Sequence, residues 1–208
     1  MVSDNIQGYR ETRENVLAND DGWITADDHE LLASITRHEG DKEVICQYLK
    51  SGTLKAADKC NADECIQNGS WPAYVDTEGL DTVGIGHLIT GDEDYDCYAG
   101  LSDEVVMQQL ATDLAQHLTA AKKLAAKNGM NINGNYVVQR FMTEMCFNIG
   151  AKRYAKFRNG LKKLASAVNK DGQYTYNDAA DEHLDSRWAR QVKGRANEMV
   201  DALRTLDA

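Results

Sequence analysis

The sequence predicts an α+β protein that is mostly helical and contains one small antiparallel β-hairpin sheet. Apolar residues recur at helical spacing through most of the second half of the chain, whereas residues 74–89 alternate between apolar and polar side chains around a turn. The 208 residues, 42% of them hydrophobic, are enough for one sizeable core or for one domain of two lobes. We therefore expect a single domain over residues 1–208, with an N-terminal extension at 1–24 and an insertion at about 41–73.

The first expected helix covers about Ala26 to His38. Thr25 is a suitable N-cap, and Gly40 supplies the stop. One face of the helix carries an apolar stripe formed by Leu31, Leu32 and Ile35. Glu39 falls at the C-terminal end, where the partial negative charge of the helix disfavours an ionised carboxylate. A glutamate there is inclined to keep its proton, as a general acid must, although a solvated glutamate before a C-cap glycine gives the same pattern.

Residues 41–73 are polar and only weakly periodic, and we expect an irregular insertion with one short helix. The chain contains 5 cysteines, and four of them cluster between residues 46 and 97: Cys46, Cys60, Cys65 and Cys97. Two disulfides among these four and plain reduced thiols are both compatible with the pattern. A four-cysteine zinc site is a third alternative, although no C-x-x-C pair supports it. The remaining cysteine, Cys146, lies in an apolar helical pattern.

The stretch "YVDTEGLDTVGIGHLIT" predicts a hairpin with an unusually bare face. Gly84 and Gly86 leave alternate positions without side chains, which weakens a strand and leaves space above it. We expect this space to be a groove, with Asp76 at its rim and Thr82 on its floor. A carboxylic acid and a carboxylate on either side of a groove are what glycoside hydrolysis requires, so Asp76 and Glu39 are candidate catalytic groups.

The remainder of the chain is expected to be helical. Ser102 is a suitable N-cap for a helix whose apolar face carries Val106, Leu110, Leu114 and Leu118. The pattern "YVVQRFMTEMCFNIG" has an apolar face broad enough for a central core helix. Three shorter amphipathic helices are expected in "AKFRNGLKKLASAVN", "YNDAADEHLDS" and "GRANEMVDALRTL".

The net charge of −10 makes nucleic acid a poor partner, because phosphate contacts need clustered Lys and Arg. The clearest basic patch is "RQVKGR" at Arg190–Arg195. No stretch approaches the length of a membrane-spanning helix, so no stable membrane insertion is expected. The N-terminal "MVSDNIQGYRETREN" lacks the apolar core of a secretory signal peptide. We therefore expect a protein that stays in the cytoplasm or leaves it by another route.

One further pattern resembles the core of a calcium-binding loop. In "ANDDGWITADD", Asn19, Asp21, Gly22 and Ile24 are in register, but the last ligand position falls on Asp28 instead of glutamate. A turn that leads into a capped helix explains the same residues. We favour the turn, and expect no metal ligands.

With these residues in place, a family resemblance becomes clear. "RHEG" followed by "YVDTEGLDTVGIGHLIT" resembles the active-site signature of the T-even bacteriophage lysozyme family, glycoside hydrolase family 24. "MCFNIGAKRYAKF" is similar to the central helix of that family and its exit, and "SRWARQVKGRA" is similar to its final substrate-side element. The matches run from about Ala26 to Leu206. The resemblance implies a lysozyme-like domain of two lobes with the active-site cleft between them.

The resemblance also implies a role for each matching residue. Glu39 would protonate the leaving glycosidic oxygen, Asp76 would stand across the cleft, and Thr82 would help to hold the attacking water. In an inverting muramidase of this kind, the two carboxyl groups stand about 6.5–9.5 Å apart. The implied substrate contacts are Gly84, Gly86, Asn148, Phe157 and Arg195.

Other matching residues have supporting roles in the family. His87 and Asp113 would form a structural pair that ties the hairpin to the following helix. Arg195 would approach Glu39 and orient it, and Trp188 would pack in the larger lobe. Asn148 stands where the family usually has glutamine.

The chain departs from the family pattern in three respects. An insertion of roughly thirty residues separates the two candidate carboxylates, where it would narrow the groove, bind another protein or merely decorate the fold. His38 replaces the acidic residue that usually precedes the catalytic glutamate, which weakens the expected contact with Arg195. The strongly acidic composition differs from the typically basic lysozymes and disfavours affinity for an anionic cell wall.

The expected function is that of a peptidoglycan muramidase without a cofactor, acting as a monomer on the glycan strand. It would accumulate in the host cytoplasm as a phage endolysin and act in the periplasm after release by a holin. A virion-borne lysozyme or a secreted antibacterial effector would share the same site. The alternatives are a lysozyme-like cell-wall-binding protein without turnover and an enzyme for another glycan such as chitin.

Overall fold

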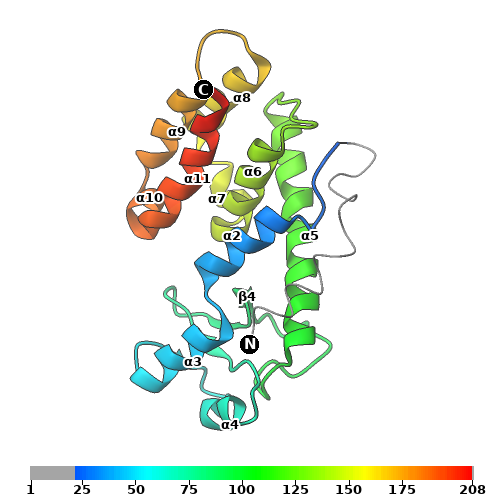
Figure 1. The fold of residues 1–208 in the computed structure, drawn as a ribbon, viewed down its shortest axis with the longest axis vertical. Helices are drawn as coiled ribbons and strands as arrows, with labels where there is room; N and C mark the ends of the chain where they lie inside the picture. The colour runs from blue at the N-terminus through cyan, green and yellow to red at the C-terminus, as the bar shows by residue number, and fades with distance from the viewer. Residues whose placement is uncertain (1–21, 208) are drawn as a thin grey trace. The chain divides into compact units, whose positions relative to one another are not determined.

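The computed structural model describes residues 22–207. It is mostly helical with a small four-stranded antiparallel sheet, so the predicted α+β class is confirmed (Figure 1). The chain divides into two compact units, and the small unit holds Leu32–Asp113. The large unit holds the described residues up to Leu31 and from Leu114 onward. The boundaries between the units fall inside α2 (His29–Glu39) and α5 (Asp103–Lys127).

The remaining elements follow the chain in order. The small unit contains α3 (Lys42–Ser51), β1 (Lys55–Ala56), α4 (Ala62–Gln67), β2 (Tyr74–Val75), β3 (Asp81–Val83) and β4 (His87–Leu88). The large unit contains α6 (Tyr136–Ile149), α7 (Ala151–Tyr154), α8 (Arg158–Asn169), α9 (Tyr176–Leu184), α10 (Arg187–Val192), α11 (Gly194–Arg204) and the 3-10 helix η1 (Thr205–Asp207). The helices expected in the second half of the chain are present, and Ser102 caps α5 by accepting the Val105 N–H at 3.3 Å.

Helix α2 begins later than expected, at His29, and Thr25 is not its N-cap. The cap is Asp28, whose Oδ1 accepts a hydrogen bond of 2.9 Å from the Leu31 N–H. The Asp28 N–H donates to the carbonyl of Thr25 at 3.1 Å, which makes a turn ahead of the helix. Arg140 fixes this arrangement, because its guanidinium donates to the two carboxylate oxygens of Asp28 at 2.6 and 2.8 Å.

Residues 41–73 are not the irregular insertion with one short helix that we expected, because they fold into α3, β1 and α4. Asp41 caps α3 through its Oδ1, which accepts the Val44 N–H at 2.9 Å, and Asn61 caps α4. Strand β1 has only 2 residues and pairs antiparallel with β2. A strand of this length forms because it pairs with a neighbouring strand. Two residues are too few to show an alternating apolar pattern, so the sequence does not reveal β1.

Polar contacts join this segment to the start of α5. Lys42 Nζ lies 2.8 Å from Asp103 Oδ1, and the Trp71 indole N–H donates to the same oxygen at 2.8 Å. Trp71 also forms an isolated antiparallel β-bridge with Leu101. The insertion is therefore an integrated part of the small unit.

The sheet has the strand order β1-β2-β3-β4, and each neighbouring pair is antiparallel. In β2 and β3, Tyr74 faces Thr82, and the turn between the strands has the sequence "DTEGL". In β3 and β4, Val83 faces His87. The predicted hairpin is thus present, and β1 and β4 extend it on its two sides.

Gly84 and Gly86 do not continue the strand alternation that the sequence suggests. With Ile85 they form the turn between β3 and β4, and both have positive φ, 61° and 71°. A left-handed backbone at two of the three turn residues favours glycine. The bare positions therefore reflect a tight turn rather than one face of a strand.

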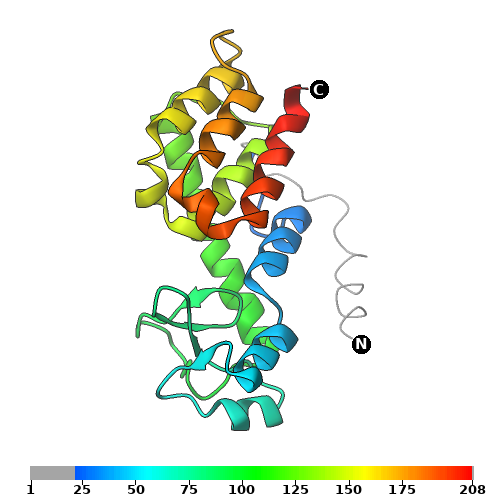
Figure 2. The same ribbon diagram turned by 90° about the vertical axis from the view of Figure 1, so that its left-hand side faces the viewer.

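Helix α6 lies in the core of the large unit, as its broad apolar face predicts. Its buried side chains include Val138, Phe141, Met142, Met145 and Cys146. Helix α9 packs against α8 and α11, and α11 packs against α6; α8, α9 and α11 lie side by side in both views (Figures 1 and 2). Trp188 is buried in this unit, and so is His183, where burial lowers the pKa of the imidazole to about 4.

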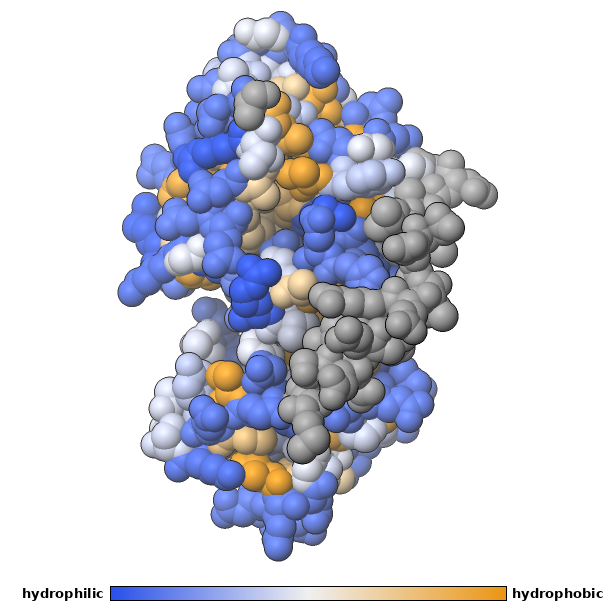
Figure 3. All heavy atoms as spheres, in the orientation of Figure 1, coloured by the Kyte–Doolittle hydropathy of each residue, from blue (hydrophilic) through white to orange (hydrophobic). Residues whose placement is uncertain are grey.

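Hydrophilic side chains predominate over the described surface on the face drawn in Figure 3, in keeping with the net charge of −10. Smaller hydrophobic groups lie between them on this face. Among residues 22–207, no helix combines the length and the apolar character that crossing a membrane requires.

Replacing Asp28 with alanine is expected to destabilise the protein by about 3 kcal/mol, because the change removes the cap of α2 and takes from Arg140 the buried carboxylate that its guanidinium binds. Urea unfolding measures this loss. Thr25→Val is the matched control, since the buried Thr25 hydroxyl has no hydrogen-bond partner among the described residues and its removal should cost little. A larger loss in Thr25→Val than in Asp28→Ala would contradict the assignment of the cap.

Candidate active site

The candidate active site is built on the end of α2. Glu39 is the last residue of that helix, and Gly40 follows it with a φ of 91°. The Gly40 N–H donates to the carbonyl of Thr36 at 3.1 Å, which closes the last helical turn. Asp41 then caps α3, so regular structure holds the chain on both sides of Glu39. The Glu39 side chain is partly exposed, as a group that meets a substrate has to be.

The carboxyl group of Glu39 lies against the backbone of Gly86. A Cβ atom added to Gly86 would lie 3.1 Å from Glu39 Oε2 and 3.3 Å from both Cδ and Cγ. The absence of a side chain at residue 86 therefore leaves room for the carboxyl group. Gly84 has a different neighbour, because its added Cβ would lie 2.9 and 3.0 Å from the two methyl carbons of Val106 on α5.

Asp76 is fixed by the turn that follows β2. Its Oδ1 accepts hydrogen bonds from the backbone N–H groups of Glu78 at 2.9 Å and Leu80 at 2.8 Å. The backbone N–H of Asp76 donates to the carbonyl of Leu80 at 2.9 Å. No hydrogen bond from the described residues reaches Oδ2. The turn thus orients the carboxylate through one oxygen and leaves the other for a water molecule or a ligand.

Tyr74 and Thr82 face each other across β2 and β3, so their side chains share one face of the sheet. Thr82 is buried, and its hydroxyl donates to the carbonyl of Leu80 at 3.3 Å. Tyr74 is buried as well. The pKa of the Tyr74 hydroxyl is raised above its usual value. Burial is the main cause, and the negative charges of Glu39 and Asp76 add to it.

The small unit therefore brings the predicted Glu39, Asp76 and Thr82 together around one tyrosine. Tyr74 is within electrostatic reach of both carboxylates and is paired with Thr82. Sequence reasoning missed Tyr74, although a signal was present: it precedes Asp76 by two positions in an alternating strand, which places the two side chains on the same face.

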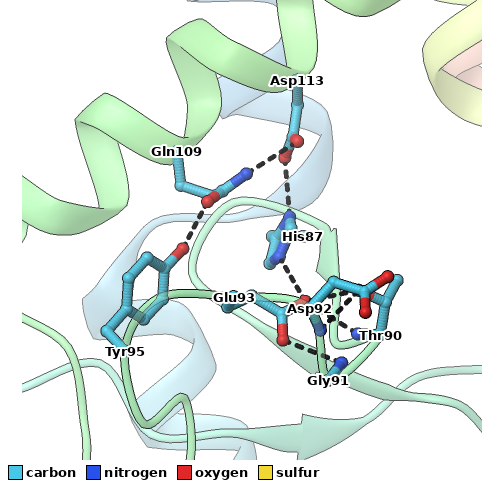
Figure 4. A network of polar contacts seen from close by, with 8 residues as sticks. All are labelled: His87, Thr90, Gly91, Asp92, Glu93, Tyr95, Gln109 and Asp113. Atoms are coloured by element: carbon cyan, nitrogen blue, oxygen red, sulfur yellow. Dashed lines mark hydrogen bonds and ion pairs between the residues drawn. The ribbon is translucent and has the colours of Figure 1, made fainter.

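The contact expected between His87 and Asp113 is present and belongs to a larger polar network (Figure 4). His87 Nδ1 lies 2.9 Å from Asp113 Oδ2, and His87 Nε2 lies 3.3 Å from Glu93 Oε1. Gln109 donates to the other oxygen of Asp113 at 2.9 Å and accepts a hydrogen bond from the Tyr95 hydroxyl. The network ties β4 and the loop after it to α5.

The carboxylates of Asp113 and Glu93 contact the two ring nitrogens of His87 and stabilise its positive charge. Glu93 Oε1 accepts the N–H and the hydroxyl of Thr90, both at 2.8 Å, and Oε2 accepts the Gly91 N–H at 2.9 Å. Burial alone would favour the neutral acid, but these hydrogen bonds outweigh it and lower the pKa of Glu93 to about 2. The hydrogen bond to Asp113 outweighs the burial of His87 and, with Glu93, raises the pKa of the imidazole. The sequence analysis missed Glu93, whose only signal is the short turn sequence that contains it.

The other predicted substrate contacts lie in the large unit. Asn148, near the end of α6, accepts a hydrogen bond from the Trp188 indole at 2.5 Å. Phe157 stacks on His183 with ring centroids 5.9 Å apart, and it meets Trp188 edge to face at 6.4 Å. Arg195 is in the first turn of α11, with its side chain partly buried. Two of the three predicted contact residues therefore touch the same tryptophan.

The cysteines are free thiols, so the disulfide alternative is not realised in the structure. Among residues 22–207, no three or more His, Cys, Asp or Glu side chains form a group that could hold a metal ion. In the calcium-like pattern, the two carboxylate oxygens of Asp28 are engaged by Arg140. Asn19 and Asp21 lie outside the described residues.

Comparison with known proteins gives no match to any protein-family model and none to a curated protein. The resemblance to the T-even bacteriophage lysozymes therefore rests on the quoted sequence motifs and stays a prediction.

Replacing His87 with glutamine is expected to cost about 2 kcal/mol of stability at mildly acidic pH, because two carboxylates lose a charged partner. The folded-state pKa of His87 is raised, so its stabilising contribution is complete below the unfolded value of about 6.5 and is lost as the pH rises through the folded value. Urea unfolding from about pH 5 to about pH 9 measures the difference. The same change at exposed His29 is the control. A difference for His87 that did not shrink at high pH would refute the charged pair.

Proposed function

We propose that this protein is a peptidoglycan muramidase that hydrolyses the β-1,4 bond between N-acetylmuramic acid and N-acetylglucosamine. The observation that carries the proposal is the placement of Glu39 and Asp76 around Tyr74, with the Glu39 carboxyl group against Gly86. Two carboxyl groups held by different structural elements are what glycoside hydrolysis needs. The resemblance of these same residues to the lysozyme signature supports the choice of substrate.

In the proposed reaction, Glu39 is the general acid. It gives its proton to the leaving glycosidic oxygen while a water molecule attacks the sugar from the opposite face. Such an inverting reaction requires carboxyl groups about 6.5–9.5 Å apart, so that the water fits between the second carboxylate and the sugar. That separation remains a prediction for Glu39 and Asp76.

Asp76 and Thr82 are proposed to hold this water. The Thr82 hydroxyl already donates its proton to the carbonyl of Leu80, so its oxygen is left to accept a hydrogen bond. Asp76 Oδ2 is likewise an acceptor. A water that donates one hydrogen to each of these oxygens keeps a lone pair for the attack on the sugar, and Asp76 takes the proton that the water loses.

Asn148, Phe157, Arg195 and the glycines of the β3–β4 turn are the proposed contacts to the glycan strand. Both catalytic carboxylates come from the chain, so no cofactor enters the reaction. Lysis of bacteria by a phage endolysin is the proposed biological role, and a secreted effector would use the same site.

The first test replaces Glu39 with glutamine. We expect the rate of turbidity loss of chloroform-treated Gram-negative cells to fall by about 10²-fold or more, because a general acid contributes that much to such a reaction. Glu78→Gln, an exposed change in the turn beside Asp76, is the matched control and should keep full activity. A wild type no faster than Glu39→Gln would exclude the enzyme and favour a cell-wall-binding protein. Mass spectrometry of the released fragments separates muramidase action from cleavage of another glycan.

The second test replaces Gly86 with alanine. The added methyl group would push on the Glu39 carboxyl group, and a displacement of about 1 Å can cost roughly 10²-fold in rate. Gly69→Ala is the matched control, because its φ of 74° is close to the 71° of Gly86 and its added Cβ meets nothing within 4 Å. Both variants therefore carry a similar backbone penalty. Equal activity of the two variants would exclude a positioning role for Gly86.

A further inference from the structure

Two cysteines of the insertion lie beside each other at the start of α4. Cys60 immediately precedes the N-cap residue Asn61, and Cys65 lies within the helix. Their sulfur atoms are 3.8 Å apart. A disulfide needs a separation of about 2.05 Å, which side-chain rotation can supply when the two thiols already touch.

The two thiols differ in their surroundings. Cys65 is buried, and its Sγ lies so close to Gly100 that a Cβ on that glycine would stand 2.7 Å away. Cys60 is partly exposed, and its Sγ accepts the backbone N–H of Ala73 at 3.3 Å. A dissolved oxidant therefore reaches Cys60, whereas Cys65 is reached through Cys60.

We propose that Cys60 and Cys65 form a redox site that closes into a disulfide by exchange with a small disulfide compound. The Cys60 thiolate attacks one sulfur of that compound, forms a mixed disulfide and releases one thiol. Cys65 then loses its proton, attacks Cys60 Sγ and expels the second thiol. The protein loses two thiols, and the oxidant, which is reduced, yields two small thiols.

The order of the steps follows from the environment of Cys65. Burial is the main cause that raises the pKa of the Cys65 thiol, and the nearby Cys60 adds to it, so Cys65 stays a neutral thiol. Cys65 is thus poorly reactive toward dissolved oxidants, yet it lies next to the sulfur that it has to attack. The disulfide would link Cys60, which precedes the N-cap of α4, to Cys65 within that helix, and it would restrict the unfolded chain.

The inference does not depend on the proposed hydrolase activity, so its test uses chemistry alone. The reduced full chain is incubated with oxidised glutathione in native buffer, and the remaining thiols are counted. We expect two of the 5 thiols to disappear. Digestion with a glutamate-specific and a lysine-specific protease cuts after Glu64, between the two cysteines, and after Lys59, which separates Cys60 from Cys46; it should release a pair of peptides joined through Cys60 and Cys65.

Variants identify the pair independently. Cys60→Ser and Cys65→Ser should each abolish the joined peptides, whereas Cys97→Ser, the matched control in a neighbouring loop, should leave them unchanged. Retention of all thiols in the wild type would overturn the proposal, and so would joined peptides that contain a different pair. Glutathione that stays attached to Cys60 would also overturn it, because the second step would then have failed. Since the mapping is made on the wild type, it does not rely on the folding of any variant.

Discussion

Room for the Glu39 carboxyl group exists because residue 86 has no side chain. An added Cβ would lie 3.1 Å from Glu39 Oε2, so a side chain at residue 86 would press on the carboxyl group at the end of α2. The same turn meets α5 through Gly84, whose added Cβ would overlap the Val106 methyl groups. Two glycines with positive φ thus set the distances between the sheet and the two helices beside it. The arrangement of the candidate site depends on this turn.

Three acidic groups of the small unit, Asp76, Glu93 and Asp113, are stabilised by backbone amides or by one imidazole. Asp76 accepts two N–H groups of its own turn, and Glu93 accepts those of Thr90 and Gly91. His87 lies between Glu93 and Asp113. Such local partners hold each carboxylate in a fixed orientation without a long cationic side chain. A net charge of −10 is therefore compatible with ordered carboxylates near the candidate site.

The sequence predicts best what depends on local pattern. The strong apolar periodicity of α5 and α6 and the turn residues of "DTEGL" are sufficient to predict those elements. Thr25 and Asp28 are both suitable N-caps by residue type. The structure selects Asp28, whose carboxylate is held by Arg140, a residue distant in the sequence. Tyr74 and Glu93 were missed for a related reason, since their environments arise from residues that other elements bring close. Gly84 and Gly86 are two positions apart, so in the sequence they look like alternate residues of a strand, whereas in the structure both have the positive φ of a turn.

The insertion contributes to the frame of the candidate site. Strand β1 pairs with β2, and the Ala57 N–H adds a hydrogen bond of 3.1 Å to the carbonyl of Ala73, directly before Tyr74. Without β1, the strand that leads to Asp76 would be an open sheet edge, with unpaired backbone groups. The insertion also supplies Cys60, which accepts the N–H of Ala73. Residues that separate the two candidate carboxylates in sequence therefore support the strand that positions one of them.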